Sequence, residues 1–91
     1  MLVARRYLIR GRVQGVGFRF FAHDTARREG VHGTVRNLPD GRVETIVEGE
    51  AGAIERFERA IRLGPRGARV EDVETEILTP TGTVTRFSIV G

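Results

Sequence analysis

The alternation of apolar and polar residues predicts where the first strand and the first helix lie. From Tyr7 to Val13, apolar or small residues alternate with arginines, a period of two that is typical of a half-buried β-strand. After a stretch with two glycines, apolar or small positions recur every three or four residues: Phe18, Phe21, Ala22, Thr25 and Ala26. This spacing predicts a helix from Phe18 to Glu29 with one face toward the core, ended by Gly30.

A turn signal divides the next polar and apolar alternation into a hairpin. Thr34–Leu38 and Arg42–Glu48 flank Pro39-Asp40-Gly41, in which proline presets φ and glycine accepts a positive φ. Three residues of the second strand are expected to face the core: Val43, Thr45 and Val47. Glu44 and Glu48 would then lie on the open face of the sheet, where arginines of the first strand could pair with them.

The second half of the chain shows the same two patterns, the helical spacing of three or four residues and the strand period of two. A helical stripe, expected to follow a turn at residues 49–52 and to end at Gly64-Pro65, contains Ala53, Ile54, Phe57, Ala60 and Ile61. Two alternating runs, Val70–Leu78 and Val84–Val90, predict the last strands. In the first run, three acids alternate with three residues expected on the other face: Val73, Thr75 and Ile77.

The order of these elements predicts an α+β fold, a ferredoxin-like (βαββαβ) two-layer sandwich with a mainly antiparallel sheet and an added C-terminal strand. Since 91 residues suffice for one core, residues 1–91 are expected to form a single domain. The N-terminus lacks the apolar run of a signal peptide, and no stretch approaches the ~20 apolar residues of a membrane span. We expect a cytoplasmic monomer with no membrane contact.

Composition removes several kinds of chemistry. Cysteine is absent, which excludes disulfides, thiolate nucleophiles and thiolate metal sites, and all 15 basic residues are arginine, which excludes a catalytic lysine. Ser88, the only serine, has no neighbouring histidine. The formal net charge is +3, but the charges are interleaved, so we expect no nucleic-acid surface.

The connection between the first strand and the first helix has the composition of an anion site. Gly15 and Gly17 allow the backbone N–H groups to turn inward, and the helix that follows adds unpaired N–H donors and the positive end of its dipole. Arg19 meets like charge in the first helical turn, a conflict that a bound anion removes. The same glycines are also compatible with a tight connection alone. A dinucleotide site is disfavoured because G-x-G-x-x-G is not matched.

Other polar residues admit structural interpretations. Asn37 can orient a water molecule through its amide oxygen, or it can simply flank a hairpin turn. His23 and His32 lack carboxylate partners at metal-ligand spacing and are expected to be solvated, without a functional role. Four acids in strand ends and turns are interpreted as surface charge: Glu48, Glu50, Glu71 and Asp72.

Two motifs resemble those of the acylphosphatase family. The stretch Gly11-Arg12-Val13-Gln14-Gly15-Val16-Gly17-Phe18-Arg19 is similar to its first motif, and Gly33-Thr34-Val35-Arg36-Asn37, followed by Gly41-Arg42-Val43 and Gly49, is similar to its second. The resemblance covers essentially the whole chain. Thr34 departs from the pattern, because the family usually has an aromatic residue there.

The resemblance implies hydrolysis of an acyl phosphate, the small-molecule substrate, to a carboxylate and inorganic phosphate, without a metal or other cofactor. Carried over by position, the phosphate-binding residues are those of the loop: Gly15, Val16, Gly17, Phe18 and Arg19. Arg19 and Asn37 would be the catalytic residues, with Asn37 orienting the attacking water. Gln14 would shape the loop, and Phe18 would hold the start of the helix against the core.

Two other kinds of protein remain possible for this sequence. The same sandwich serves RNA-recognition and small-ligand regulatory domains. The strand Val43–Glu48 argues against RNA, because its outward positions carry acids where an RNA-recognition motif presents stacking aromatics. The other alternative is a domain separated from a larger protein that handles carbamoyl phosphate. The identity of the physiological acyl phosphate is not encoded in these residues.

Overall fold

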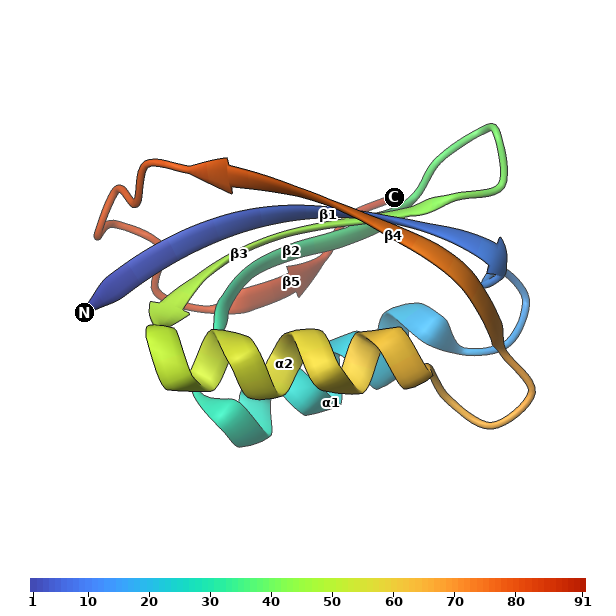
Figure 1. Ribbon diagram of the computed structural model, residues 1–91, viewed down its shortest axis with the longest axis horizontal. Helices are drawn as coiled ribbons and strands as arrows, with labels where there is room; N and C mark the ends of the chain where they lie inside the picture. Colours follow the sequence, from blue (N-terminus) through green and yellow to red (C-terminus); the bar gives the residue numbers. More distant parts are fainter.

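Two helices cover one face of a five-stranded sheet in the computed structural model, which describes residues 1–91 (Figure 1). The elements follow one another as β1 (Leu2–Arg12), α1 (Phe18–Glu29), β2 (His32–Asn37), β3 (Val43–Glu50), α2 (Ala51–Leu63), β4 (Arg69–Leu78) and β5 (Phe87–Ile89). Neither helix is long and apolar enough to span a membrane.

The sheet has the strand order β4-β1-β3-β2-β5. All neighbouring strands are antiparallel except β2 and β5, which pair in parallel through Gly33–Val35 and Phe87–Ile89. The predicted ferredoxin-like sandwich with an added C-terminal strand is therefore confirmed. Because β1 and β2 both run antiparallel to β3, their C-terminal ends lie at the same end of the sheet.

Several predicted boundaries were wrong, among them the start of the first strand, which begins at Leu2 and not at Tyr7. The turn expected at residues 49–52 does not exist, because β3 continues to Glu50 and α2 begins at Ala51. The last strand is shorter than expected, since β5 spans only Phe87–Ile89. The first helix has the predicted bounds, and both glycines that flank it, Gly17 and Gly30, adopt the left-handed conformation (φ 76° and 73°).

The core lies between the sheet and the helices. Phe57 of α2 is fully buried, with its ring centroid 6.4 Å from that of Tyr7 on β1 and 6.1 Å from that of Phe87 on β5. The hydroxyl of Tyr7 donates a hydrogen bond to Glu58 (2.9 Å), which satisfies the polar end of a buried side chain. Phe18, the first residue of α1, is also buried, so the core fixes the start of this helix.

The open face of the sheet is less open than its sequence predicts. Val43, Thr45 and Val47 are buried as expected, but Glu44 and Glu48 are buried too (5% and 7% exposed). Glu44 pairs with an arginine of β1, Arg6, as predicted.

Glu48 does not pair with an arginine and corrects the expectation that it is surface charge. Its carboxylate instead accepts hydrogen bonds from the backbone N–H groups of Thr81 and Gly82 and from the Thr81 hydroxyl. The physical reason is that the connection between β4 and β5, residues 79–86, passes beside this end of β3 and removes the carboxylate from water.

Candidate active site

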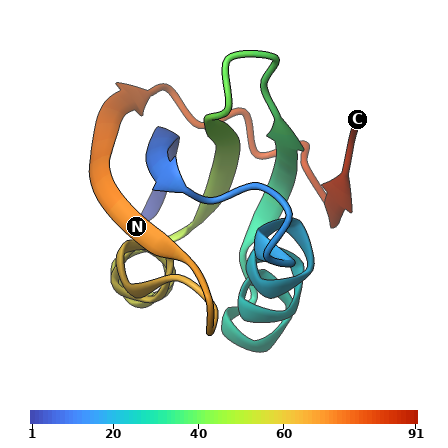
Figure 2. The ribbon, with the colours of Figure 1, turned by 90° about the vertical axis from the view of Figure 1, so that its right-hand side faces the viewer.

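The loop between β1 and α1, residues 13–17, lies at one end of the molecule beside the β2–β3 hairpin turn (Figure 2). Gly15 and Gly17 have φ values of 73° and 76°. A Cβ atom at either position would meet nothing within 4 Å, so glycine is required by the backbone conformation and not by crowding. Val13 is buried and Gly15 and Gly17 are exposed, so the loop turns away from the core over two residues.

The loop and the first turn of α1 present a row of unpaired backbone donors. The first helical hydrogen bond runs from the N–H of Phe21 to the carbonyl of Gly17 (3.0 Å), and no side chain caps the helix. None of the backbone N–H groups from Gly15 to Phe20 donates to another group of the protein. These N–H groups and the positive end of the helix dipole together favour an anion.

Arg19 adds a full positive charge to this row of donors. The first turn of α1 contains no acidic residue, and Arg19 forms no ion pair with an aspartate or glutamate side chain. Its Nη1 atom donates to the backbone carbonyl of Gly91 (2.9 Å), and the side chain is half-buried. A guanidinium with free donors next to backbone N–H groups suits a phosphoryl group, because its planar fork can bind two oxygens at once.

Asn37 lies at the C-terminal end of β2, the same end of the sheet at which β1 runs into the loop. Its backbone pairs with Val43 of β3, which also pairs with Ile9 of β1. The amide oxygen Oδ1 of Asn37 is buried and has no hydrogen-bond partner in the protein. Leaving such an atom unsatisfied costs roughly 1–3 kcal/mol, so a partner from outside the chain, such as water, is expected there.

Gln14 joins the loop to the hairpin. Its side-chain amide nitrogen donates to the carbonyls of Leu38 (2.8 Å) and Arg42 (3.0 Å), on the two sides of the hairpin turn. Because Leu38 follows Asn37 directly, this contact brings the two predicted halves of the site together. The sequence motif drew attention to Gln14, but only the structure reveals that it reaches across to the hairpin.

The two histidines lie elsewhere and are less solvated than predicted. His23 is 34% exposed, packs its ring edgewise on Phe87 with centroids 6.0 Å apart, and places Nδ1 3.6 Å from Asp24. His32 Nδ1 lies 3.2 Å from the carbonyl of Val84. Both line a groove of about 420 Å³ that includes no residue of the loop and does not include Asn37. No three His, Asp or Glu side chains are grouped as a metal site would require.

Asp40 is the acid nearest in sequence to Asn37, and its charge is held within the hairpin turn. It accepts hydrogen bonds from the backbone N–H (3.1 Å) and the Nε (2.9 Å) of Arg42. These bonds, the backbone one first, hold the pKa of Asp40 below its usual value. The carboxylate therefore stays ionised and bound to Arg42.

Fold and site together define a class of protein, a ferredoxin-like α/β sandwich with a glycine-containing loop of unpaired backbone N–H donors between its first strand and first helix. The family model of acylphosphatase matches residues 5–89. The chain is 52% identical to an acylphosphatase of Anaeromyxobacter dehalogenans over 87 residues, which are 96% of this chain and 94% of that protein. It is 48% identical over 91 residues to an acylphosphatase of Roseiflexus sp., covering 99% and 98% of the two chains.

Comparison with solved structures gives the same family. The crystal structure of acylphosphatase from Bacillus subtilis matches with a TM-score of 0.94 and 38% identity over 100% of both chains. A full-length HypF in a phosphate- and nucleotide-bound form contains a similar region, with a TM-score of 0.88 and 31% identity, over 12% of its chain. The chain belongs to the acylphosphatase family. At this identity over nearly its whole length, it is a hydrolase that acts on acyl phosphates.

Proposed function

We propose that the loop Gly15–Arg19 holds the phosphoryl group of the acyl phosphate and that Asn37 orients the attacking water. The observation that carries this proposal is the convergence of two unsatisfied groups at one end of the sheet. The backbone N–H groups from Gly15 onward are unpaired, and the buried Oδ1 of Asn37 has no hydrogen-bond partner. The residue after Asn37, Leu38, has the carbonyl that Gln14 contacts.

In this mechanism the phosphoryl oxygens accept hydrogen bonds from the backbone N–H groups of Gly15, Val16, Gly17 and Phe18 and from the Arg19 guanidinium. These donors are fixed before the substrate arrives, so they stabilise the negative charge of the transition state without reorganisation. Loose phosphoryl transfer requires mainly such positioning and charge stabilisation.

The water molecule donates a hydrogen bond to the amide oxygen of Asn37 and directs a lone pair at phosphorus. A new P–O bond forms to the water oxygen while the bond from phosphorus to the acyl oxygen breaks, and that oxygen leaves with the electron pair as a carboxylate. Both protons of the water stay with the product, which forms as dihydrogen phosphate. The leaving carboxylic acid has a pKa near ~4, so no general acid is needed. A neutral amide suits the role better than a carboxylate would, because it does not repel a dianion.

Two variants test the two roles with acetyl phosphate as substrate. Arg19→Ala should lower kcat by at least roughly 100-fold and weaken inhibition by inorganic phosphate, because it removes charge from both the ground state and the transition state. Asn37→Ala should lower kcat while the inhibition constant for phosphate changes little, because water orientation matters only for the chemical step.

Arg59→Ala is the matched control for Arg19→Ala, since Arg59 is an exposed arginine of α2 with no ion pair. It should retain normal kcat and phosphate inhibition. Near-normal turnover in Arg19→Ala would refute the role of the loop. A parallel loss of phosphate affinity in Asn37→Ala would show that Asn37 serves the hairpin and not the water.

The groups proposed to act in hydrolysis also predict that chelation of metals and substitution of the histidines leave the rate unchanged. Backbone N–H groups, a guanidinium and a neutral amide do not titrate between about pH 5 and 8 and need no metal. EDTA and the substitutions His23→Ala and His32→Ala should therefore leave kcat unchanged. The monomeric state, the single domain, the cytoplasmic location and the lack of affinity for single-stranded RNA remain predictions, and an RNA-binding assay beside the phosphate-release assay tests the last.

A further inference from the structure

Gln14 occupies a distinctive place between the two halves of the site. Both carbonyls that it contacts already accept a backbone hydrogen bond within the hairpin turn. The N–H of Leu38 donates to the carbonyl of Arg42 (2.8 Å), and the N–H of Gly41 donates to the carbonyl of Leu38 (3.1 Å). The two hydrogens of the Gln14 amide give each carbonyl a second bond.

The hairpin carbonyls do not need Gln14 to avoid being left unsatisfied. Each keeps its backbone partner if the side chain is changed. The cost of fixing a half-buried glutamine in one rotamer is therefore not explained by burial of polar groups alone. What the contact does achieve is a short link from Gly15, through Gln14 and Leu38, to Asn37.

No other side-chain hydrogen bond joins residues 13–17 to the hairpin. The remaining connection between them runs through the sheet, from β1 across β3 to β2, and ends at the pairs of Val43 with Ile9 and Asn37. Beyond those pairs β2 leaves the sheet, while β1 continues to Arg12 paired only with β4, so no strand pairing fixes the loop against the amide of Asn37.

We infer that Gln14 is a positioning residue for hydrolysis, which acts through Asn37 by holding the water-orienting amide at a fixed distance from the phosphate-binding loop. This inference rests on the proposed function. Its physical basis is that a displacement of about 1 Å between reacting groups can cost roughly 100-fold in rate. Phosphate binding alone needs no such alignment, because the donors of the loop and Arg19 suffice for it.

Gln14→Met tests this role, since methionine keeps the length and bulk of the side chain and removes both donors. We expect kcat for acetyl phosphate to fall about 10-fold or more, with less than about a 3-fold change in the phosphate inhibition constant. Asp40→Ala is the matched control, because it removes contacts within the same turn and leaves the carbonyls of Leu38 and Arg42 in place. It should keep kcat within about 2-fold.

A double-mutant cycle with Asn37→Ala distinguishes positioning from general stabilisation. If Gln14 acts through Asn37, then Gln14→Met should lower kcat by less than about 2-fold in the Asn37→Ala protein. Multiplicative losses, an equal rise in the phosphate inhibition constant, normal turnover in Gln14→Met, or an equal loss in Asp40→Ala would each overturn the inference alone. Normal turnover in Asn37→Ala would instead refute the proposed role of Asn37 and this inference with it.

Discussion

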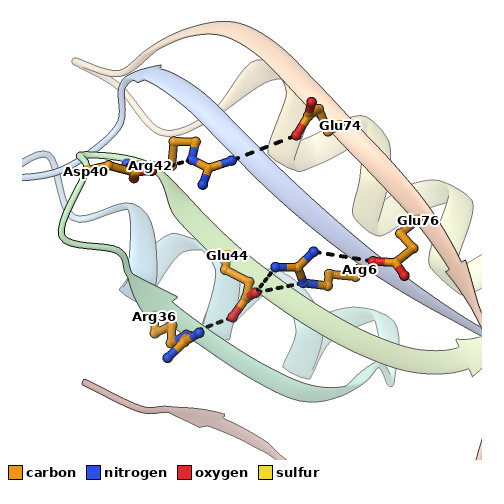
Figure 3. A network of polar contacts seen from close by, with 7 residues as sticks. All are labelled: Arg6, Arg36, Asp40, Arg42, Glu44, Glu74 and Glu76. Carbon is orange, nitrogen blue, oxygen red and sulfur yellow. Dashed lines mark hydrogen bonds and ion pairs between the residues drawn. The ribbon is translucent and has the colours of Figure 1, made fainter.

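Glu44 should be a main electrostatic determinant of stability, and its replacement by glutamine tests this directly. The carboxylate lies between two arginines from neighbouring strands (Figure 3). Oε2 accepts from Nε and Nη2 of Arg6, both at 2.7 Å, and Oε1 accepts from Nε of Arg36 at 2.7 Å. Glutamine keeps the shape of the side chain and removes the charge, so it isolates the electrostatic contribution.

The expected magnitude follows from the exposure of the three side chains. Breaking a fully buried ion pair costs about 3–5 kcal/mol, whereas exposed pairs contribute about 0–1 kcal/mol. The side chain of Glu44 is 7% exposed, but those of Arg6 and Arg36 are 34% and 52% exposed, so water compensates part of their loss. We therefore expect Glu44→Gln to lower the free energy of unfolding by about 1.5–3 kcal/mol, which for a domain of this size lowers Tm by roughly 10 °C.

The lowered pKa of Glu44 determines how its contribution to stability changes with pH. Burial alone would raise the pKa of Glu44, but hydrogen bonds from Arg36 and Arg6 outweigh it, and the pKa lies below its usual value. A carboxyl with a lowered folded-state pKa stabilises the protein above its unfolded-state pKa, about 4.3. That contribution is lost as the pH falls through the folded-state value.

Urea unfolding followed by circular dichroism, at pH 7 and at about pH 3.5, measures both quantities. The difference between the original chain and Glu44→Gln should be largest at pH 7 and smaller at the lower pH. Glu76→Gln is the matched control: Glu76 is 58% exposed and contacts Arg6 at 3.3 Å, so its loss should stay below about 0.5 kcal/mol. Equal losses in both variants, or a Glu44→Gln loss that does not change with pH, would refute this reasoning.

Two further predictions concern the loop and the β4–β5 connection. Gly17→Ala should lower the free energy of unfolding by about 1–2 kcal/mol and raise the phosphate inhibition constant, because Gly17 has a φ of 76°. Gly52→Ala in α2 is the control and should be neutral or stabilising. Urea unfolding and phosphate inhibition assays compare the two variants. Glu48→Gln should speed hydrogen exchange of residues 79–86 at pH 7. Backbone bonds from Gly82 and Thr81 lower the pKa of Glu48, so this restraint is present above about pH 4.3 and weakens as the pH falls through the folded-state value; unchanged exchange in the variant would contradict it.

Local sequence signals were sufficient for the elements that position the site. The bounds of α1 could be predicted because its apolar stripe and its two flanking glycines act within a few residues of each other. The hairpin was likewise predictable from Pro39-Asp40-Gly41. Such signals depend only on the backbone and on which face of an element is buried.

Contacts between distant polar side chains were not predictable in the same way. Gln14 reaches carbonyls 24 and 28 positions away, and Glu48 reaches residues 33 and 34 positions away. Neither contact leaves a periodic trace in the sequence. The alternation of polar and apolar residues also failed to predict burial in the edge strand β4. Val73 is 8% exposed, as expected, but Ile77 is 75% exposed. Burial of an edge-strand residue depends on whether a helix packs against it, which alternation does not encode.

The placement of charge connects the sheet to the site. No acidic residue precedes Asp24, so β1, the loop and the first turn of α1 carry positive charge only. Two arginines of the open sheet face, Arg6 and Arg36, are paired with Glu44, and the acid in the hairpin turn, Asp40, is held by Arg42. Arg19 pairs with no aspartate or glutamate side chain. In the proposed site, a carboxylate beside Arg19 would compete with the phosphoryl group for the same guanidinium, so pairing acids elsewhere would keep this end of the molecule available to an anionic substrate.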